Sequence, residues 1–302
     1  MTDDLERFDA VVVGAGLAGL KAAADLARAD LKTALVDSGY LGGLVMNVGL
    51  IEGAAEFDGQ SGADLVDRFM TDALGSGADY RIGEAGELVR DGDLWRLPDI
   101  GIAAPNVVLA TGASLKKLGV PGEDALTGRG VSQCAYCDGG LYRGKPVVVV
   151  GGGDAAVQEA LHLAELCGAV TMLVRGDGLK ARKSFRERAE AFDNLTVRTN
   201  VDVLEVVGED GVDAIRIHDR ASGANETMPT EAVFVFVGVA PETALAPADA
   251  KRDSAGALRV DGGMRTNLPG LYAVGAARAG HAGGLTDALG DAVAAARAIT
   301  AG

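Results

Sequence analysis

The feature that most constrains this chain is a pattern of apolar strand, glycine-rich turn, alanine-rich helix and second strand, because the pattern occurs twice. In the first copy, a strand over 10–13 leads into Gly14, Gly16 and Gly19, and the second strand ends in Asp37. The G-x-G-x-x-G spacing predicts a tight turn, close approach of a pyrophosphate and close helix–strand packing. The helix N–H groups would bind the pyrophosphate, and the Asp37 carboxylate would accept hydrogen bonds from ribose hydroxyls.

The second copy begins with the strand VVVV and turns at Gly151, with Ala156 in place of the third glycine. The fingerprint allows this alanine. The copy ends at Arg175, where the first copy has an acid. Because a guanidinium suits a 2′-phosphate, the second copy is predicted to prefer NADP(H). Lys180 and Arg182 follow closely and would add to the same pocket, with a solvated basic face as the alternative.

Two dinucleotide units in a chain of 302 residues predict a flavin nucleotide paired with a nicotinamide nucleotide. Further apolar strands precede Gly112, Gly238 and Gly275 and fit the same plan. We expect an α/β fold with two Rossmann-like nucleotide-binding domains, the first of them discontinuous and interrupted by the second. The expected ranges are 1–113 and 242–302 for the flavin domain and 114–241 for the nicotinamide domain.

The charge of the chain disfavours several partners. Lys and Arg number 28 against 43 Asp and Glu, a formal net charge of −15. Such a surface repels nucleic acid and anionic membranes, because phosphate neutralisation drives that kind of binding. The longest apolar run, residues 10–20, is shorter than the roughly 20 residues that span a bilayer. The acidic N-terminus differs from a secretory signal, so we expect a cytoplasmic protein without nucleic-acid or membrane partners.

Cys134 and Cys137 form a C-x-x-C motif shortly before the second glycine turn. A zinc site normally needs four ligands, and the three histidines are scattered along the chain, so we expect no metal. The spacing favours a dithiol/disulfide couple. Cys167, in the helix after the second turn, is expected to be a buried structural thiol.

The segment GRGVSQCAYCDGGLYRGKPVVVVGGGDAA resembles the core of low-molecular-weight bacterial thioredoxin reductases, in which C-A-x-C-D-G precedes the NADPH fingerprint. LATGASLKKLGVPGEDAL and VFVFVGVAPET are similar to neighbouring segments of that family, in the same order. The resemblance covers nearly the whole chain. It implies a homodimeric flavoprotein in which an FAD domain is interrupted by an NADPH domain carrying the cysteines. Electrons would pass from NADPH through FAD and the cysteine couple to thioredoxin or another small dithiol partner.

The resemblance also implies roles for individual residues. Cys137 would be the sulfur nearest the flavin, Cys134 would attack the substrate disulfide, and Asp138 would protonate the leaving thiolate. An N-capping role for Asp138 in the helix after the cysteines is a compatible alternative. The residues expected to bind FAD are Gly14, Gly16, Leu17, Ala18, Gly19, Asp37, Ser38, Gly42, Gly43, Thr111, Gly112, Gly275 and Leu285. Those expected to bind NADP(H) are Gly151, Gly153, Asp154, Ala155, Ala156, Arg175 and Lys180.

The chain departs from the family pattern mainly around the expected flavin site. Ala276 follows Gly275 where the family usually has an aspartate that holds the ribityl chain, and Leu44 replaces a customary glutamine. In the nicotinamide domain, Gly176 removes the second arginine of the phosphate clamp. We therefore expect FAD to leave the protein more readily, and the preference for NADPH to be modest.

Three other functions fit parts of the sequence. One is a flavin-dependent dithiol oxidase that uses oxygen, another a reductase fed by a donor other than NADPH. The third is a nucleotide-binding sensor without turnover. The retained GGGDAA motif with Arg175 favours the NADPH reductase, and the intact cysteine pair argues against the sensor.

Overall fold

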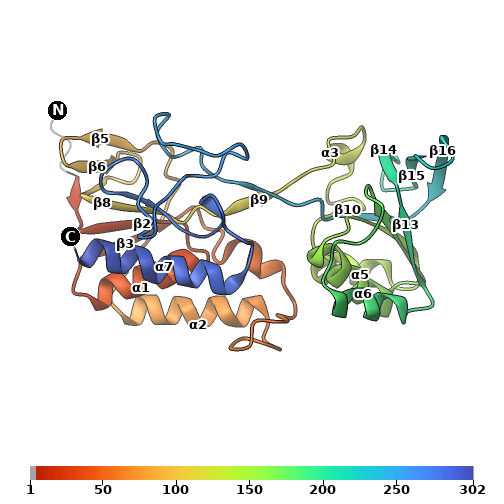
Figure 1. The fold of residues 1–302 in the computed structure, drawn as a ribbon, viewed down its shortest axis with the longest axis horizontal. Coiled ribbons are helices and arrows are strands. Elements are labelled where there is room, and N and C mark those ends of the chain that lie inside the picture. The colour runs from red at the N-terminus through yellow and green to blue at the C-terminus, as the bar shows by residue number, and fades with distance from the viewer. Residues whose placement is uncertain (1–4, 302) are drawn as a thin grey trace. The chain divides into compact units, whose positions relative to one another are not determined.

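The computed structural model describes residues 5–301, and the chain divides into two compact units (Figure 1). Unit 1 is formed by the chain up to Ser114 and from Ala240 onward, and unit 2 by Leu115–Val239. The first crossing lies one residue after the expected position and the second two residues before it. At the crossings, β9 (Ala113–Leu115) pairs with β18 (Val239–Pro241).

Unit 1 is built on a five-stranded parallel sheet with the order β19-β8-β2-β3-β4. Helix α1 lies between α7 and α2 on one face of this sheet (Figure 1). A smaller sheet, β1-β7-β6-β5, belongs to the same unit. The bounds are β1 (Glu6–Arg7), β2 (Ala10–Val13), α1 (Leu17–Arg28), β3 (Thr33–Asp37), η1 (Gly43–Asn47), α2 (Gly62–Gly75), β4 (Asp79–Ile82), β5 (Val89–Asp91), β6 (Leu94–Leu97), β7 (Ile102–Ala104), β8 (Asn106–Leu109), β19 (Leu271–Ala273), η3 (Gly275–Ala277) and α7 (Leu285–Thr300).

The continuous apolar runs in the strands of unit 1 follow from burial on both faces. Ala10 and Val12 of β2 face a core shared with the helices. Val11 and Val13 face a second core, in which Trp95 and Leu97 of the small sheet are buried. A strand covered on both sides has no polar face, so its sequence does not alternate.

Unit 2 repeats this plan with a parallel sheet of order β10-β17-β11-β12-β13. Helices α5 and α6 cover one face, and the antiparallel sheet β14-β15-β16 covers the other. The bounds are α3 (Glu123–Leu126), β10 (Val131–Ser132), α4 (Ala135–Asp138), η2 (Gly139–Tyr142), β11 (Pro146–Val150), α5 (Asp154–Leu166), β12 (Ala169–Val174), α6 (Lys183–Glu190), β13 (Leu195–Thr199), β14 (Val201–Val207), β15 (Ala214–Asp219), β16 (Ala224–Pro229) and β17 (Ala232–Val235).

In both units the strand before the glycine turn lies at the point where the strand order reverses. β2 has β3 on one side and β8 on the other, and β11 has β12 and β17. Ligands of open α/β sheets bind beyond the carboxyl ends of the strands at such a point. The expected fold, two Rossmann-like units with the first interrupted by the second, is confirmed.

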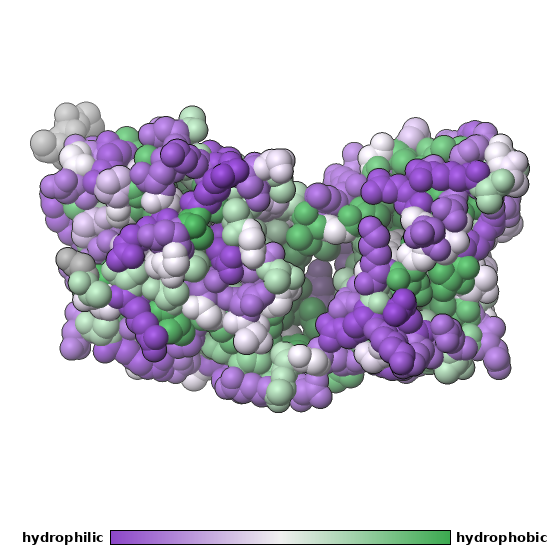
Figure 2. Space-filling model, viewed as in Figure 1, coloured by the Kyte–Doolittle hydropathy of each residue, from purple (hydrophilic) through white to green (hydrophobic). Residues whose placement is uncertain are grey.

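Hydrophilic residues dominate the face of each unit that is visible in Figure 2, as the net charge of −15 suggests. The apolar residues on this face are scattered among polar ones. Across residues 5–301, no helix has the length and apolar character needed to cross a membrane.

Candidate active site

The first glycine turn, between β2 and α1, is held by two glycines that pack against backbone. Gly14 has a positive φ of 105°, and a Cβ there would clash with the Ala110 carbonyl oxygen. A Cβ on Gly19 would clash with the Gly14 carbonyl oxygen. At Gly16 the nearest atom to an added Cβ is a backbone oxygen 3.8 Å away. The first and third glycines therefore serve packing, whereas the second leaves space beside the turn.

Asp37, the buried last residue of β3, is tied to this turn. Its Oδ2 accepts a hydrogen bond from the Ala15 N–H and its Oδ1 accepts one from the Gly39 N–H, each at 2.8 Å. The Gly42 N–H in turn donates to the Ala15 carbonyl. Asp37 thus fixes the backbone at the place where it is predicted to meet a ribose.

Other residues of the predicted FAD site meet the same edge of the sheet. Gly275 follows β19 with a φ of 64°, and a Cβ on it would lie 3.2 Å from the Ala18 Cβ. The Thr111 hydroxyl, after β8, donates to the Glu242 carbonyl. Helix α7 begins at Leu285. The predicted residues from β2, β3, β8 and β19 are therefore brought together. Ser38 is exposed, and no atom lies within 4 Å of a Cβ placed on Gly43 or Gly112.

The second glycine turn, between β11 and α5, has the same form as the first, except that its third position accommodates an alanine. A Cβ on Gly151 would clash with the Phe236 carbonyl oxygen, just as a Cβ on Gly14 would clash with the Ala110 carbonyl oxygen. The alanine that replaces the third glycine, Ala156, is buried without displacing the turn. No atom lies within 4 Å of a Cβ placed on Gly153, so this turn also leaves space at its second glycine.

The basic residues after β12 fold back over the second turn. The Lys180 N–H donates to the Gly152 carbonyl at 2.7 Å, which places this loop beside the turn. Arg182 forms an ion pair with Asp154, with Nε and Oδ2 2.8 Å apart. The Arg182 charge is therefore paired with an acid at the surface, and Arg175 lies exposed directly after β12.

Both turns have the features that a dinucleotide requires. Helices α1 and α5 have 12 and 13 residues, and neither has a side-chain hydrogen bond at its N-cap glycine. Their first N–H groups therefore point toward the space beside Gly16 and Gly153, where a pyrophosphate can accept hydrogen bonds. The residues present fit a dinucleotide at each turn.

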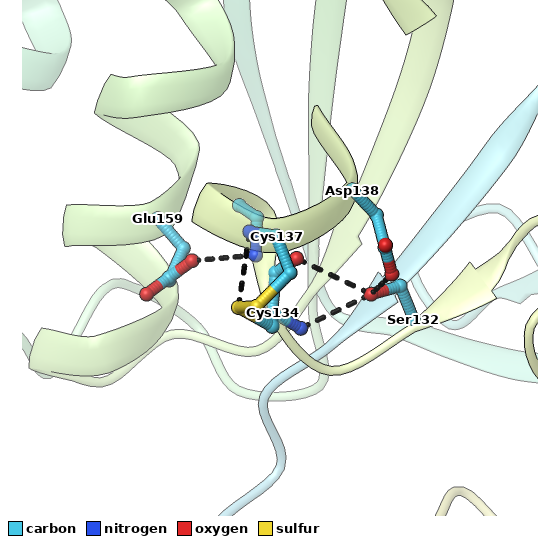
Figure 3. The surroundings of a disulfide bond; sticks show 6 residues. Ser132, Cys134, Cys137, Asp138 and Glu159 are labelled. Carbon is cyan, nitrogen blue, oxygen red and sulfur yellow. Dashed lines mark hydrogen bonds between the residues drawn. A yellow bond between two sulfur atoms is a disulfide. The ribbon is translucent and has the colours of Figure 1, made fainter. Parts of the chain in front are cut away.

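Cys134 and Cys137 are joined by a disulfide across the short helix α4, with their Cα atoms 5.3 Å apart (Figure 3). Cys134 is the N-cap residue of α4, and its Sγ accepts a hydrogen bond from the Cys137 N–H at 3.1 Å. Cys134 is 8% exposed, whereas Cys137 is exposed at the surface. The two sulfurs of the couple therefore have different surroundings.

Asp138 does not cap the following helix, because the N-terminus of η2 has no side-chain hydrogen bond from it. Its Oδ2 instead accepts a hydrogen bond from the Ser132 hydroxyl at 2.6 Å (Figure 3). The Ser132 oxygen accepts one from the Cys134 N–H at 3.1 Å. Ser132 thus connects the Asp138 carboxylate to the backbone of the first cysteine.

Three residues of this centre were not singled out from the sequence: Ser132, Glu159 and His162. Glu159 lies on α5 and binds the backbone of α4, and burial raises the pKa of its carboxyl to about 7. The His162 ring stacks on the Tyr136 ring with centroids 3.9 Å apart, and burial lowers the pKa of the imidazole. The sequence did contain a signal for Glu159. The residue falls on the 3.6-residue period of the apolar positions of α5, and an acid at such a position indicates a buried carboxylate with polar partners.

Cys167 is a free, buried thiol at the C-cap of α5, which confirms the expected burial and places the residue at the end of the helix. Burial raises the pKa of its thiol, so the residue is poorly reactive. Among residues 5–301, no three His, Cys, Asp or Glu side chains are grouped as a metal site.

Comparison with known proteins places this geometry in a family. The sequence profile of the pyridine nucleotide-disulphide oxidoreductases matches residues 8–298. A thioredoxin reductase of Listeria innocua is 36% identical over 295 residues, which cover 96% of this chain and 92% of the relative. The crystal structure of Lactococcus lactis thioredoxin reductase has a TM-score of 0.93 at 31% identity and covers 97% of both chains. That of T. acidophilum thioredoxin reductase has a TM-score of 0.92 at 32% identity and covers 98% of both.

The match to the profile spans far more than half of the chain, and the relatives exceed 30% identity over nearly all of it. The protein is an oxidoreductase of the thioredoxin reductase type, a group that uses FAD and NADPH. The resemblance expected from the C-A-x-C-D-G segment is confirmed. The chain belongs to the pyridine nucleotide-disulphide oxidoreductase family.

Proposed function

We propose that this protein reduces the disulfide of thioredoxin, or of a similar small dithiol protein, at the expense of NADPH. The observation that carries the proposal is the disulfide of α4, whose Cys137 is exposed and whose Cys134 sulfur accepts a backbone N–H. The relatives named thioredoxin reductase support thioredoxin as the partner. When bound, NADPH supplies a hydride and FAD relays its two electrons to the disulfide.

The two cysteines would have different roles after reduction. The Cys137 N–H that donates to the Cys134 Sγ stabilises a thiolate at Cys134, because a hydrogen bond to the charged form lowers a thiol pKa. Cys134 is therefore proposed as the nucleophile that attacks the partner disulfide, and Cys137 as the thiol that resolves the mixed disulfide and lies nearest the flavin. Cys134 is buried in the oxidised form, so its attack requires a movement that uncovers the sulfur.

Asp138 is proposed as the acid that protonates the leaving thiolate. The Ser132 hydroxyl holds one of its oxygens at 2.6 Å, which fixes the carboxyl beside the cysteine turn. A carboxyl next to a dithiol centre can transfer a proton without crossing bulk solvent. Asp138→Asn should slow the dithiol step and leave reduction of bound flavin by NADPH unchanged.

NADPH is proposed as the donor because the second turn is intact and Arg175 and Lys180 lie at its edge. Arg182 is paired with Asp154 and would contribute less to binding a 2′-phosphate. FAD is proposed at the first turn, with one molecule per chain. Ala276 offers no carboxylate to the ribityl chain, so Ala276→Asp should make FAD harder to remove by dialysis.

The deciding experiment measures thioredoxin-dependent oxidation of NADPH by the FAD-loaded protein, with oxygen uptake recorded in parallel. Turnover that needs thioredoxin, consumes little oxygen and disappears in Cys134→Ser and Cys137→Ser is the expected result. Cysteine variants that reduce thioredoxin at the wild-type rate would rule the proposal out. Oxygen uptake with a small dithiol and no NADPH would identify a dithiol oxidase instead.

A cytoplasmic location and a homodimeric state are also proposed. Both are supported by the resemblance to bacterial thioredoxin reductases. Sedimentation of the purified protein at several concentrations measures the oligomeric state directly. A single species with the mass of one 30.6 kDa chain at every concentration would exclude the dimer.

A further inference from the structure

Glu159 is a carboxylate placed within the apolar stripe of a helix. The neighbouring positions of that stripe, Ala156, Ala160 and Leu163, are all buried in the core of unit 2. Glu159 itself is 7% exposed. An acid is rarely retained in such a stripe unless it has specific polar partners, because burial penalises its charged form.

The partners of Glu159 are the backbone N–H groups of the cysteine turn. Its Oε2 accepts a hydrogen bond from the Ala135 N–H at 2.8 Å (Figure 3). The carboxylate also accepts one from the Tyr136 N–H. The next N–H, that of Cys137, donates to the Cys134 Sγ. Three consecutive donors of one short turn are thus divided between a carboxylate and a sulfur.

The raised pKa of Glu159 comes mainly from burial and not from neighbouring charged side chains. Burial is the main cause of its raised pKa of about 7, and the two N–H groups of α4 partly oppose it. On α5 itself, His162 has a lowered pKa and Glu165 is exposed. The charged side chains of α6 are exposed, since that helix packs through Phe185 and Ala189. The remaining titratable groups on the elements packed against α5 are Tyr136 and Asp138 of α4, Tyr142 of η2 and Arg198 of β13.

We propose that Glu159 is a positioning residue that holds the cysteine turn and, once the disulfide is reduced, shares one proton with the Cys134 sulfur. The inference rests on the proposed redox role of the cysteine pair. In the step, two electrons break the S–S bond and two protons are taken up. One proton converts Cys137 to a thiol, and the other resides on either the Cys134 sulfur or the Glu159 carboxylate. The electrons come from the bound cofactors in turnover, or from dithiothreitol in the tests below.

The expected consequence is a mutual effect on acidity. An ionised Glu159 raises the thiol pKa of Cys134, because a like charge nearby disfavours the thiolate. Glu159→Gln removes the charge but keeps an oxygen that accepts from the Ala135 N–H. The thiol pKa of Cys134 should then fall by about one unit, because the carboxylate and the sulfur are bound by N–H groups of the same short turn.

The first experiment measures that acidity directly. In the reduced full-length Cys137→Ser protein, the alkylation rate of Cys134 by iodoacetamide is followed from pH 5.5 to 9.5, with the labelled peptide identified by mass spectrometry. Glu159→Gln should shift the midpoint downward by about one pH unit. Glu165→Gln is the matched control, because it removes the same charge from an exposed site on the same helix and should leave the midpoint unchanged. An unchanged or raised midpoint in Glu159→Gln would overturn the proposal.

The second experiment uses the protein with both cysteines and an equilibrium with dithiothreitol. At pH 8, Glu159→Gln should favour the reduced form by about tenfold over wild type, which corresponds to about 30 mV for this two-electron couple. The difference should vanish near pH 5.5, where Glu159 is already neutral. A difference that is the same at both pH values would indicate an effect of packing alone and would refute the shared proton.

A measurement on the wild type does not depend on whether the variant folds. Infrared difference spectra recorded on reduction at pH 7.5 should show a carboxylate converting to a protonated carboxyl group. Absence of that signal in a protein that reduces thioredoxin would reject this inference and leave the proposed function intact. A wild type that shows the infrared signal on reduction by dithiothreitol but never reduces thioredoxin would reject the proposed function and leave this inference intact.

Discussion

The two units share a five-stranded parallel sheet and a glycine turn, but a buried acid that binds loop N–H groups lies at a different position in each. In unit 1, Asp37 at the end of β3 accepts two backbone N–H groups beside the glycine turn. In unit 2, the corresponding position after β12 is the exposed Arg175, and Glu159, a buried acid of this unit, lies beneath the cysteine turn. The common frame fixes where backbone N–H groups are available. A buried carboxylate, Asp37, holds the nucleotide turn in unit 1, and another, Glu159, holds the redox turn in unit 2.

The third position of the turn gives the largest expected contrast. Gly19→Ala should destabilise unit 1 severely, because the new Cβ would clash with the Gly14 carbonyl oxygen and backbone cannot move aside easily. A loss of 3 kcal/mol or more, of order the upper range for overpacking, and loss of bound FAD are expected. Urea unfolding followed by circular dichroism and the flavin absorbance measure both.

The matched change in unit 2 is Ala156→Gly, which should cost only about 1 kcal/mol through helix propensity. Should the two substitutions destabilise equally, the closer packing of α1 on its turn would not be the reason for the glycine in unit 1.

Glu159, the buried acid beneath the cysteine turn, should give the free energy of unfolding an unusual dependence on pH. The folded pKa of Glu159 is about 7 and its ordinary value is 4.5, so between these values the folded state binds more protons than the unfolded state. The contribution of this group to stability is therefore present below about pH 4.5 and is lost as pH rises to 7. Glu159→Gln should match wild type near pH 4.5 and be more stable by up to about 3 kcal/mol at pH 8.

Denaturant unfolding at several pH values, with Glu165→Gln as the control, tests this directly. A stability difference between Glu159→Gln and wild type that does not change with pH would mean that folding does not raise the pKa of Glu159.

Asp37, the buried acid beside the first glycine turn, should stabilise the backbone of that turn. Asp37→Asn leaves one oxygen for two N–H groups, so either the Ala15 or the Gly39 N–H loses its acceptor. A loss of about 1–3 kcal/mol is expected for one unsatisfied buried donor, together with weaker FAD binding. Calorimetry of the protein with and without added FAD separates the two effects. Asp37→Asn with unchanged stability but weakened FAD binding would assign Asp37 to the ligand alone.

The exposed residue at the matching position of unit 2 should affect only the ligand. Arg175→Ala should raise the KM for NADPH by about five- to tenfold, or about 1 kcal/mol, because an exposed contact with a phosphate is partly screened by water. The KM for NADH and the unfolding midpoint should not change. Arg175→Lys, which keeps the charge, should recover part of the affinity. Equal changes in both KM values would show that Arg175 does not distinguish the two nucleotides.

The sequence alone was sufficient to predict the two strand–turn–helix units, because their patterns are local. The strand and helix around Gly14 and Gly151 follow from apolar runs and glycine spacing, which act within some 25 residues. The antiparallel sheet β14-β15-β16 was not predicted, because its pairing depends on contacts that short-range patterns do not record. Ser132 and Glu159 were missed for a different reason, because a side-chain hydrogen bond to a turn follows no fixed spacing in the sequence. Glu159 is 24 residues from the N–H it binds, and only the packing of α5 against α4 brings the two together.

The position of Trp95 has a practical consequence for all measurements of folding. It is the single tryptophan of the chain, 2% exposed in unit 1, with its indole N–H donating to the Pro269 carbonyl at 3.0 Å. Intrinsic fluorescence excited in the indole band therefore reports the state of unit 1 and is silent on unit 2. If the emission shifts to longer wavelength before the ellipticity has been lost, the remaining ellipticity belongs to unit 2. One unlabelled sample can thus reveal whether the two nucleotide-binding units melt together or in sequence.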